Sequence, residues 1–315
     1  MVDFRYHLIS IIAVILALAV GIFAGSGFLG GPLLDDLRHR LDRIDRTNSG
    51  LQSQIVDLHD QQDTYETFVN AVDPFLVGGK LDGTQVVIVS FDGTDGKMLD
   101  GLDNEMTAAG ARVGSTITIR SKFALASQVE RDQLALALGS SSGKASDLRL
   151  QAAGELAGRI RNVLSGSSQA DPRLHAVTQL EQLLDSLSKQ GFIDVSGGIS
   201  AQSIPVGADF IVAVGSDNPP PFDVAPFARR FAMGLSSPRT GVLVASPTKS
   251  VWGVVSSIRQ DPDASATVTT VDDADTGIGR IATALGLGDA AKGSVGQYGT
   301  GDRSTGIIPS PSPSA

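Results

Sequence analysis

The first pattern along the chain is a continuous apolar stretch near the N-terminus. No Asp, Glu, Lys or Arg occurs from Leu8 to Leu34, and the part up to Phe23 is almost entirely aliphatic. About 20 apolar residues in a helix span the core of a bilayer, and a helix pairs its own backbone groups there. The stretch therefore predicts a single transmembrane anchor over residues 1–33. The alternative is a cleaved signal peptide, whose apolar region usually runs only about 7–15 residues.

A heptad pattern follows this stretch. From 34 to 72, apolar residues recur at alternating spacings of three and four, with Asn48 at one of the a positions. Such a narrow stripe is typical of the seam between two helices, and a polar a position favours a two-stranded register. The pattern predicts a parallel, homodimeric coiled coil over 34–73, ended by Pro74 because proline disfavours helical geometry just before it. The alternative is a helix packed on its own domain. The predicted interface residues are Leu34, Leu37, Leu41, Ile44, Asn48, Leu51, Ile55, Leu58 and Tyr65.

Beyond the coiled coil the pattern becomes an alternation of strands and helices. Gln85–Val89 is a β-branched run typical of a strand buried on both faces. A helix to about Ala109 and a strand over Arg112–Ile119 complete a βαβ unit. Ser127 and Glu130 form a capping box that opens the next helix. Further strands are expected at 210–214, 241–245 and 266–271, and further helices at 146–164, 172–190 and 276–287.

This alternation predicts an α/β fold with a doubly wound, mostly parallel sheet. We place this domain over residues 80–300 and expect it to lie outside the cytoplasm. The remaining residues, 301–315, are rich in proline and serine and are expected to form a disordered tail.

Composition narrows the chemistry. The chain contains no cysteine, so disulfides and thiolate ligands for zinc or iron–sulfur clusters are excluded for it. A Cu(I) site would want clustered Cys or Met ligands, and the four methionines are scattered. The formal charge of −9 and the absence of a basic stripe argue against nucleic acid as a partner.

Carboxylates follow several predicted strands at their carboxyl ends, where open α/β sheets bind ligands. Such groups could hold a hard cation, but Asp also starts turns and caps helices, and Asp275 has the position of an N-cap. The chain lacks a dinucleotide fingerprint, a P-loop and the GxSxG and HExxH motifs, so we predict no enzyme and no cofactor. The weak metal candidates are Asp92, Asp95, Asp217, Asp272 and Asp273.

Charges around the anchor give a mixed signal for topology. Arg5 favours a cytoplasmic N-terminus, whereas several arginines between Arg38 and Arg46 follow the anchor. Short N-terminal tails before large domains usually stay inside. We therefore expect a single-pass protein of the cell membrane, with its N-terminus in the cytoplasm and its bulk outside.

Several segments together resemble a known family. They are Met1–Ser10, Ala17–Ile22, Val271–Thr276, Gly279–Ala282 and Gly296–Gly299. The resemblance is to the actinobacterial MctB family, named for mycobacterial copper transport protein B, and it covers residues 1 to about 300. It implies an envelope protein with a role in copper homeostasis or efflux, with an outer-membrane channel as one interpretation.

The residues themselves do not predict a pore, because they contain one apolar span and no series of alternating strands of about 10 residues. The family resemblance supplies no copper-binding motif to transfer. Relatives are also connected with cell-envelope and septal assemblies. A non-enzymatic dimeric scaffold that binds an envelope partner is therefore the main alternative to copper homeostasis. A metal-dependent enzyme around Asp92 and Asp272 is a third hypothesis.

Overall fold

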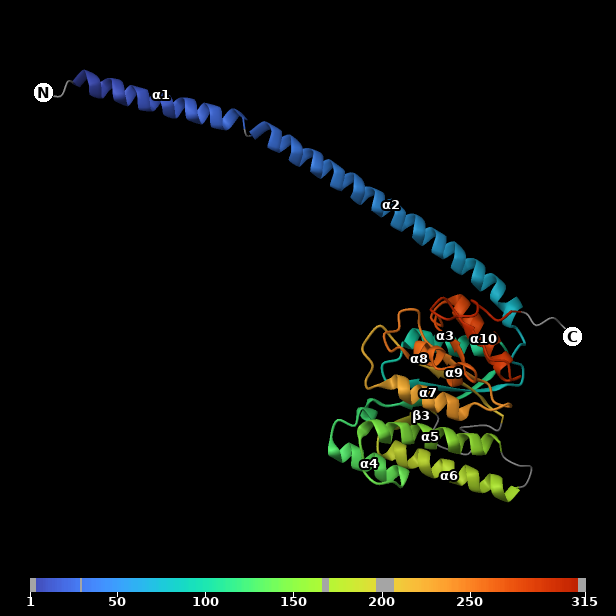
Figure 1. The fold of residues 1–315 in the computed structure, drawn as a ribbon. Coiled ribbons are helices and arrows are strands. Elements are labelled where there is room, and N and C mark those ends of the chain that lie inside the picture. The colour runs from blue at the N-terminus through green and yellow to red at the C-terminus, as the bar shows by residue number, and fades with distance from the viewer. Residues whose placement is uncertain (1–3, 29, 166–169, 197–206, 311–315) are drawn as a thin grey trace. The chain divides into compact units, whose positions relative to one another are not determined.

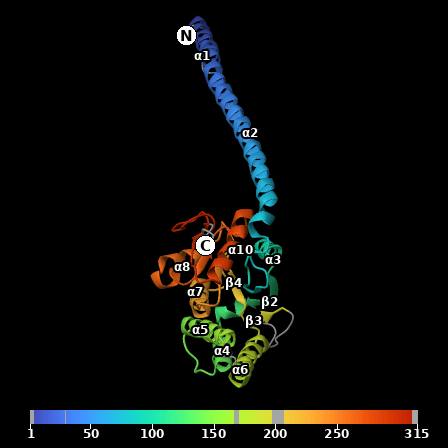
Figure 2. The same ribbon diagram turned by 90° about the vertical axis from the view of Figure 1, so that its right-hand side faces the viewer.

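The computed structural model describes residues 4–28, 30–165, 170–196 and 207–310. The chain divides into two compact units, residues 1–67 and residues 68–315. Figures 1 and 2 show the elements of both units.

The first unit consists of helix α1 (Phe4–Phe28) and most of helix α2 (Gly30–Val77). The segment Arg5–Gly25 of α1 is long and apolar enough to cross a membrane. Along α2, the predicted interface residues are solvent-exposed in the single chain; Leu41 is 59% exposed and Ile44 is 61% exposed. The side chain of Leu34 lies outside the described residues. The other predicted interface residues, from Leu37 to Tyr65, are exposed too.

The predicted helix end at Pro74 is wrong, because α2 continues through Pro74 to Val77. Proline cannot donate the backbone hydrogen bond to the carbonyl four residues before it, and this loss is costly in the middle of a helix. In α2 the proline stands in the last turn. There the carbonyl of Pro74 accepts a hydrogen bond from the Gly78 backbone nitrogen at 3.2 Å, and Val77 beyond it is fully buried.

The end of α2 belongs to the core of the second unit. Val69, an a position in the heptad pattern, is 3% exposed and packs with Val77 and Leu81 in a hydrophobic cluster of that unit. Apolar residues of α2 therefore serve two purposes along the helix. They are exposed in the first unit, and Val69 and Val77 are buried in the second.

Among the described residues of the second unit, the sheet has seven strands in the order β3-β2-β1-β4-β5-β6-β7. β3 runs antiparallel to β2, and the other neighbouring strands pair in parallel. Their bounds are β1 Gln85–Phe91, β2 Arg112–Ile119, β3 Ile193–Val195, β4 Asp209–Ala213, β5 Val242–Ala245, β6 Thr269–Val271 and β7 Gln297–Tyr298.

Helices connect these strands. They are α3 Gly96–Ala108, the 3₁₀ helix η1 Ser121–Ala124, α4 Gln128–Leu138, α5 Ala145–Leu164, α6 Ala170–Lys189, α7 Val224–Leu235, α8 Val254–Gln260, α9 Pro262–Ser265 and α10 Gly277–Ala290. The predicted capping box is confirmed at the start of α4, where Ser127 and Glu130 exchange hydrogen bonds.

Strand β1 has a hydrophobic cluster on each of its faces. Val87 and Val89 point into a cluster formed with α4, α5, α6 and α7, whereas Val86 and Ile88 point into a cluster formed with α3 and α10. Figures 1 and 2 show α4, α5 and α6 gathered away from α3 and α10. The fold is therefore a mostly parallel α/β sheet with apolar helices on both faces.

Six elements were not predicted, namely η1, β3, α7, α8, α9 and β7. β3 and β7 are too short to carry a sequence pattern, and they close the two edges of the sheet. Helix α7 has a clear amphipathic spacing, with Phe227, Phe231 and Leu235 all buried, and this spacing could have revealed it.

The residues just after position 300 make contacts with the domain. The backbone nitrogen of Thr305 donates to the Gln297 carbonyl at 2.6 Å, and Gly299 donates to the Gly306 carbonyl at 3.0 Å. Part of the segment that we expected to be a disordered tail is thus hydrogen-bonded to strand β7. Residues 311–315 lie outside the described residues.

Candidate functional site

The sheet order reverses between β1 and β4, and the carboxyl ends of two such strands form the usual ligand crevice of an open α/β sheet. Asp92 and Asp95 follow β1 at this point. Asp92 accepts a hydrogen bond from the Ser121 backbone nitrogen at 2.7 Å and lies 3.3 Å from Arg120. Asp95 is the N-cap of α3. Both carboxylates are therefore held by turns and helix ends, as in the alternative explanation from sequence.

The loop after β4 contains Asp217, which is exposed and accepts a hydrogen bond from the Asn218 side chain at 2.9 Å. The indole nitrogen of Trp252 donates to the Asn218 carbonyl at 2.8 Å. The indole ring also lies against Gly93, where a Cβ atom, if one were added, would be 3.6 Å from the ring. A buried tryptophan thus packs over the crevice between the two strand ends.

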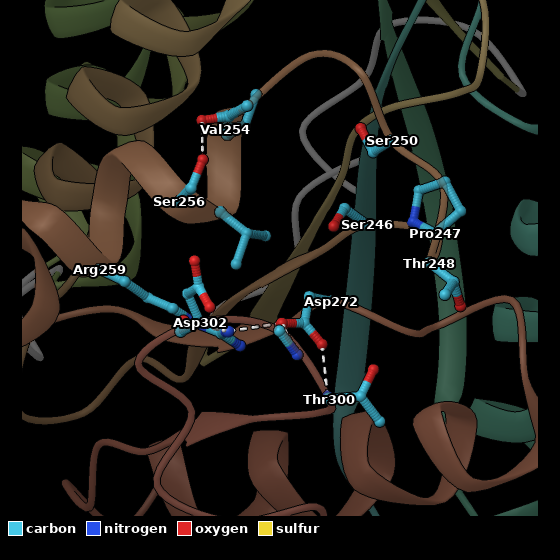
Figure 3. A pocket seen from close by; sticks show the side chains of 13 residues that line it. Ser246, Pro247, Thr248, Ser250, Val254, Ser256, Arg259, Asp272, Thr300 and Asp302 are labelled. Atoms are coloured by element: carbon cyan, nitrogen blue, oxygen red, sulfur yellow. Dashed lines mark hydrogen bonds and ion pairs between the residues drawn. The ribbon is translucent and has the colours of Figure 1, made fainter.

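A cavity of about 200 Å³ opens instead at the carboxyl ends of β5 and β6 (Figure 3). Hydroxyl side chains from the loop after β5 and from the first turn of α8 line it, together with an arginine and two aspartates. Such hydroxyls can both donate and accept hydrogen bonds, so the cavity suits a small polar molecule. The polar lining includes Ser246, Thr248, Ser250, Ser256, Arg259 and Asp272.

One wall of this cavity is built by Arg259 and Asp272. The Arg259 side chain is 2% exposed and forms an ion pair with Asp272. It also donates to the Thr270 hydroxyl at 2.8 Å and to the carbonyls of Tyr298 and Asp302 at 2.6 and 3.1 Å. Asp272 in turn accepts from the backbone nitrogens of Thr300 and Gly301, both at 2.9 Å. The pair therefore fastens residues 298–302 to the end of β6.

Asp273 and Asp275 occupy different environments. The predicted N-cap role of Asp275 is wrong, because Thr276 caps α10 and Asp275 accepts hydrogen bonds from Thr248. Asp273 is 3% exposed, and its Oδ1 atom has no hydrogen-bond partner among the described residues. Burial, together with the negative charges of Asp272 and Asp275, raises the pKa of Asp273 to about 6.

The structure therefore brings Asp272 and Asp273 together and leaves Asp92, Asp95 and Asp217 at other strand ends. Within the part of the chain that it describes, no three His, Cys, Asp or Glu side chains are placed to hold a metal ion. Sequence reasoning missed Arg259 and the hydroxyl cluster. Their signal was weak, because single serines and arginines in a loop–helix segment are common.

The available donors do not fit a Cu(I) site. The chain has no cysteine, and Met98 and Met106 are fully buried in the apolar cluster beneath α3 and α10. His39, His59 and His175 are exposed on helices. The Nε2 atom of His175 lies 2.8 Å from the Nε2 atom of Gln179. Soft metal ions need several such donors at one point, which the described residues do not supply.

Taken together, the apolar helix α1 and the parallel α/β sheet define a protein with a candidate membrane anchor and a separate α/β domain. Over residues 1–309 the chain matches the family described as "Copper transport outer membrane protein, MctB", and it belongs to this family.

Curated relatives agree with this match. The protein named "Copper transporter MctB" from Mycobacterium tuberculosis (strain ATCC 25618 / H37Rv) is 31% identical, over 96% of this chain and 97% of the relative. A protein of the same name from Mycobacterium leprae (strain TN) is 30% identical, over 98% of this chain and 99% of the relative. The similarity therefore spans both units, and the family description is one of transport rather than of an enzyme class.

Replacing the buried carboxyl of Asp273 by an amide tests how much the ionised side chain lowers the free energy of unfolding. A raised pKa means that the folded state binds the proton more tightly than the unfolded state, so stability falls as pH rises from about 4 to about 6. Asp273→Asn should therefore be more stable than the wild type at pH 7, by roughly 1–3 kcal/mol, and nearly equal to it at pH 4. Urea unfolding followed by the fluorescence of Trp252, the single tryptophan, measures this.

The control is Asp217→Asn at an exposed position, which should leave stability unchanged at both pH values. Asp209 keeps part of the pH dependence in all variants, because burial raises its pKa to about 6 as well. A loss of stability in Asp273→Asn at pH 7 would contradict the prediction.

Proposed function

We propose that this protein contributes to copper homeostasis in the cell envelope. The observation that carries the proposal is the family match over residues 1–309, together with the name "Copper transporter MctB" of its curated relatives. Because the chain lacks thiolates and its described residues assemble no soft-donor site, we propose that it does so without a high-affinity Cu(I) site of its own. The chain would then act on copper through a protein partner in the envelope.

Deleting the gene in its host tests the proposed role. We expect growth to stop at a lower copper concentration and the copper content of the cells to change, with both restored by the wild-type gene. Zinc in place of copper serves as the control metal. Unchanged copper tolerance together with an unchanged copper content in the deletion strain would contradict the proposal.

We further propose that the protein works as a parallel homodimer, inserted with its N-terminus in the cytoplasm. Support comes from the heptad pattern and from the exposure of its apolar residues in the single chain, where Leu51 is 52% and Leu58 is 63% exposed. A stripe of this kind costs free energy in water and is covered when two helices pair through a and d positions. Asn48 is exposed in the same stripe and would set the register.

Charged residues in this stripe should separate the two chains. In Leu41→Asp/Leu51→Asp, each pairing would bury carboxylates without partners, so dimer affinity should fall by more than roughly tenfold. Sedimentation equilibrium of the full chain in detergent measures the mass. Asp57 is neither an a nor a d position of the heptad pattern. Asp57→Asn is therefore the matched control and should remain dimeric. A double variant that sediments like the wild type would rule out the heptad seam.

A further inference from the structure

The last turns of α2 are packed closely onto the second unit. Val69 touches the first turn of α10 so tightly that a Cβ at Gly277 would lie 2.7 Å from its Cγ1 atom. Val77 is fully buried on the same cluster. Because glycine alone leaves room for this approach, the end of α2 is a docked segment of the unit.

Between these two valines the docked segment carries a carboxylate, Asp73, that meets a second carboxylate. Glu105 of α3 is 6% exposed, and its carboxyl group lies within reach of the Asp73 carboxyl. The Oδ1 atom of Asp73 and the Oε1 atom of Glu105 are buried, and neither has a donor from the described residues. Two ionised carboxylates in contact repel each other, whereas one proton shared between them satisfies both groups.

The surroundings do not neutralise this pair. Arg280 of α10 forms a long ion pair with Glu105, its Nε atom 3.9 Å from Oε2, and its Nη1 atom donates to the Asp275 carbonyl. Asp73, Glu105 and Arg280 line a cavity of about 480 Å³. Lys97 and Asp100 of α3 line it too, and their opposite charges offset each other. One guanidinium, paired with Glu105 only, therefore faces a buried carboxyl group and a half-buried one.

We propose that a proton shared by Asp73 and Glu105 latches the end of α2 onto α3 and α10, and that its loss at alkaline pH releases this segment. With the proton present, the pair forms a hydrogen bond across the junction of the two helices. Without it, the negative charges of buried Glu105 and half-buried Asp73 face each other, and both carboxylates gain hydration when the segment leaves the surface.

The direction of the titration follows from the same contacts. Burial, then the hydrogen bond to Asp73 and then its charge, raise the pKa of Glu105 from 4.5 to about 8, while Arg280 opposes the rise. The docked state thus binds the proton more tightly than the released state. Docking is most favourable below the ordinary pKa of a glutamate and weakens as pH rises through about 8.

A spin label at the docked segment tests the latch. The chain contains no cysteine, and Phe75 is 87% exposed, so Phe75→Cys places one nitroxide on the last turns of α2 without entering the core. In the full chain in detergent, we expect the label to become more mobile between pH 6 and 10, with a midpoint near the pKa of about 8. Circular dichroism checks that the domain stays folded over this range.

The same label on Glu105→Gln should remain immobile over the whole range, because the neutral amide keeps the hydrogen bond and cannot ionise. Asp103→Asn, on the exposed side of α3, is the matched control and should titrate like the wild type. If Glu105→Gln does not fold, Asp73→Asn serves the same purpose. A wild-type label with no pH response, or an equal response in Glu105→Gln, would overturn the proposal.

Discussion

The strands in the middle of the sheet bury side chains on both faces, and the rest of the second unit follows from this. Phe210 and Val212 of β4 face one hydrophobic cluster, while Ile211 and Ala213 face the other. Burying both faces requires apolar helices on each side. On one side the cover includes Val69 and Val77 of α2, so the helix that carries the heptad pattern also supplies part of the domain core.

Elements set by a local pattern could be predicted from the sequence, whereas elements set by contacts in the fold, such as the end of α2, could not. The apolar N-terminal helix, the central strands and the capping box of α4 could be predicted, because each depends on a local pattern. The end of α2 was not, since Pro74 signals a helix end locally while the burial of Val77 favours one more turn. The short edge strands β3 and β7 depend on their neighbours in the sheet, and no local pattern marks them.

The carboxylates at the strand ends show a similar limit. The sequence predicted where they would stand, but the partners that decide their role come from distant segments. Asp272 meets Arg259 from α8 and the backbone of residues 300–301. Asp73 meets Glu105 across two helices. Neither pairing could be inferred from spacing along the chain.

The family to which this chain belongs is described by copper transport. The side chains that could bind copper limit how the chain can act on this metal. Histidines and methionines are present, yet the described histidines are exposed singly, Met98 and Met106 are buried in the apolar core, and Met233 is half-buried against it. In the role proposed above, an envelope partner rather than this chain holds the ion. Its apolar anchor and its exposed heptad stripe are features that suit such a role.

The most direct measurement is Cu(I) binding by the purified full chain in competition with a coloured Cu(I) chelator under anaerobic conditions. We expect the chelator to retain all of the copper, because thiolates are absent and the buried methionines are inaccessible. Removal of one equivalent of Cu(I) from the chelator by the chain would contradict an indirect role in copper homeostasis.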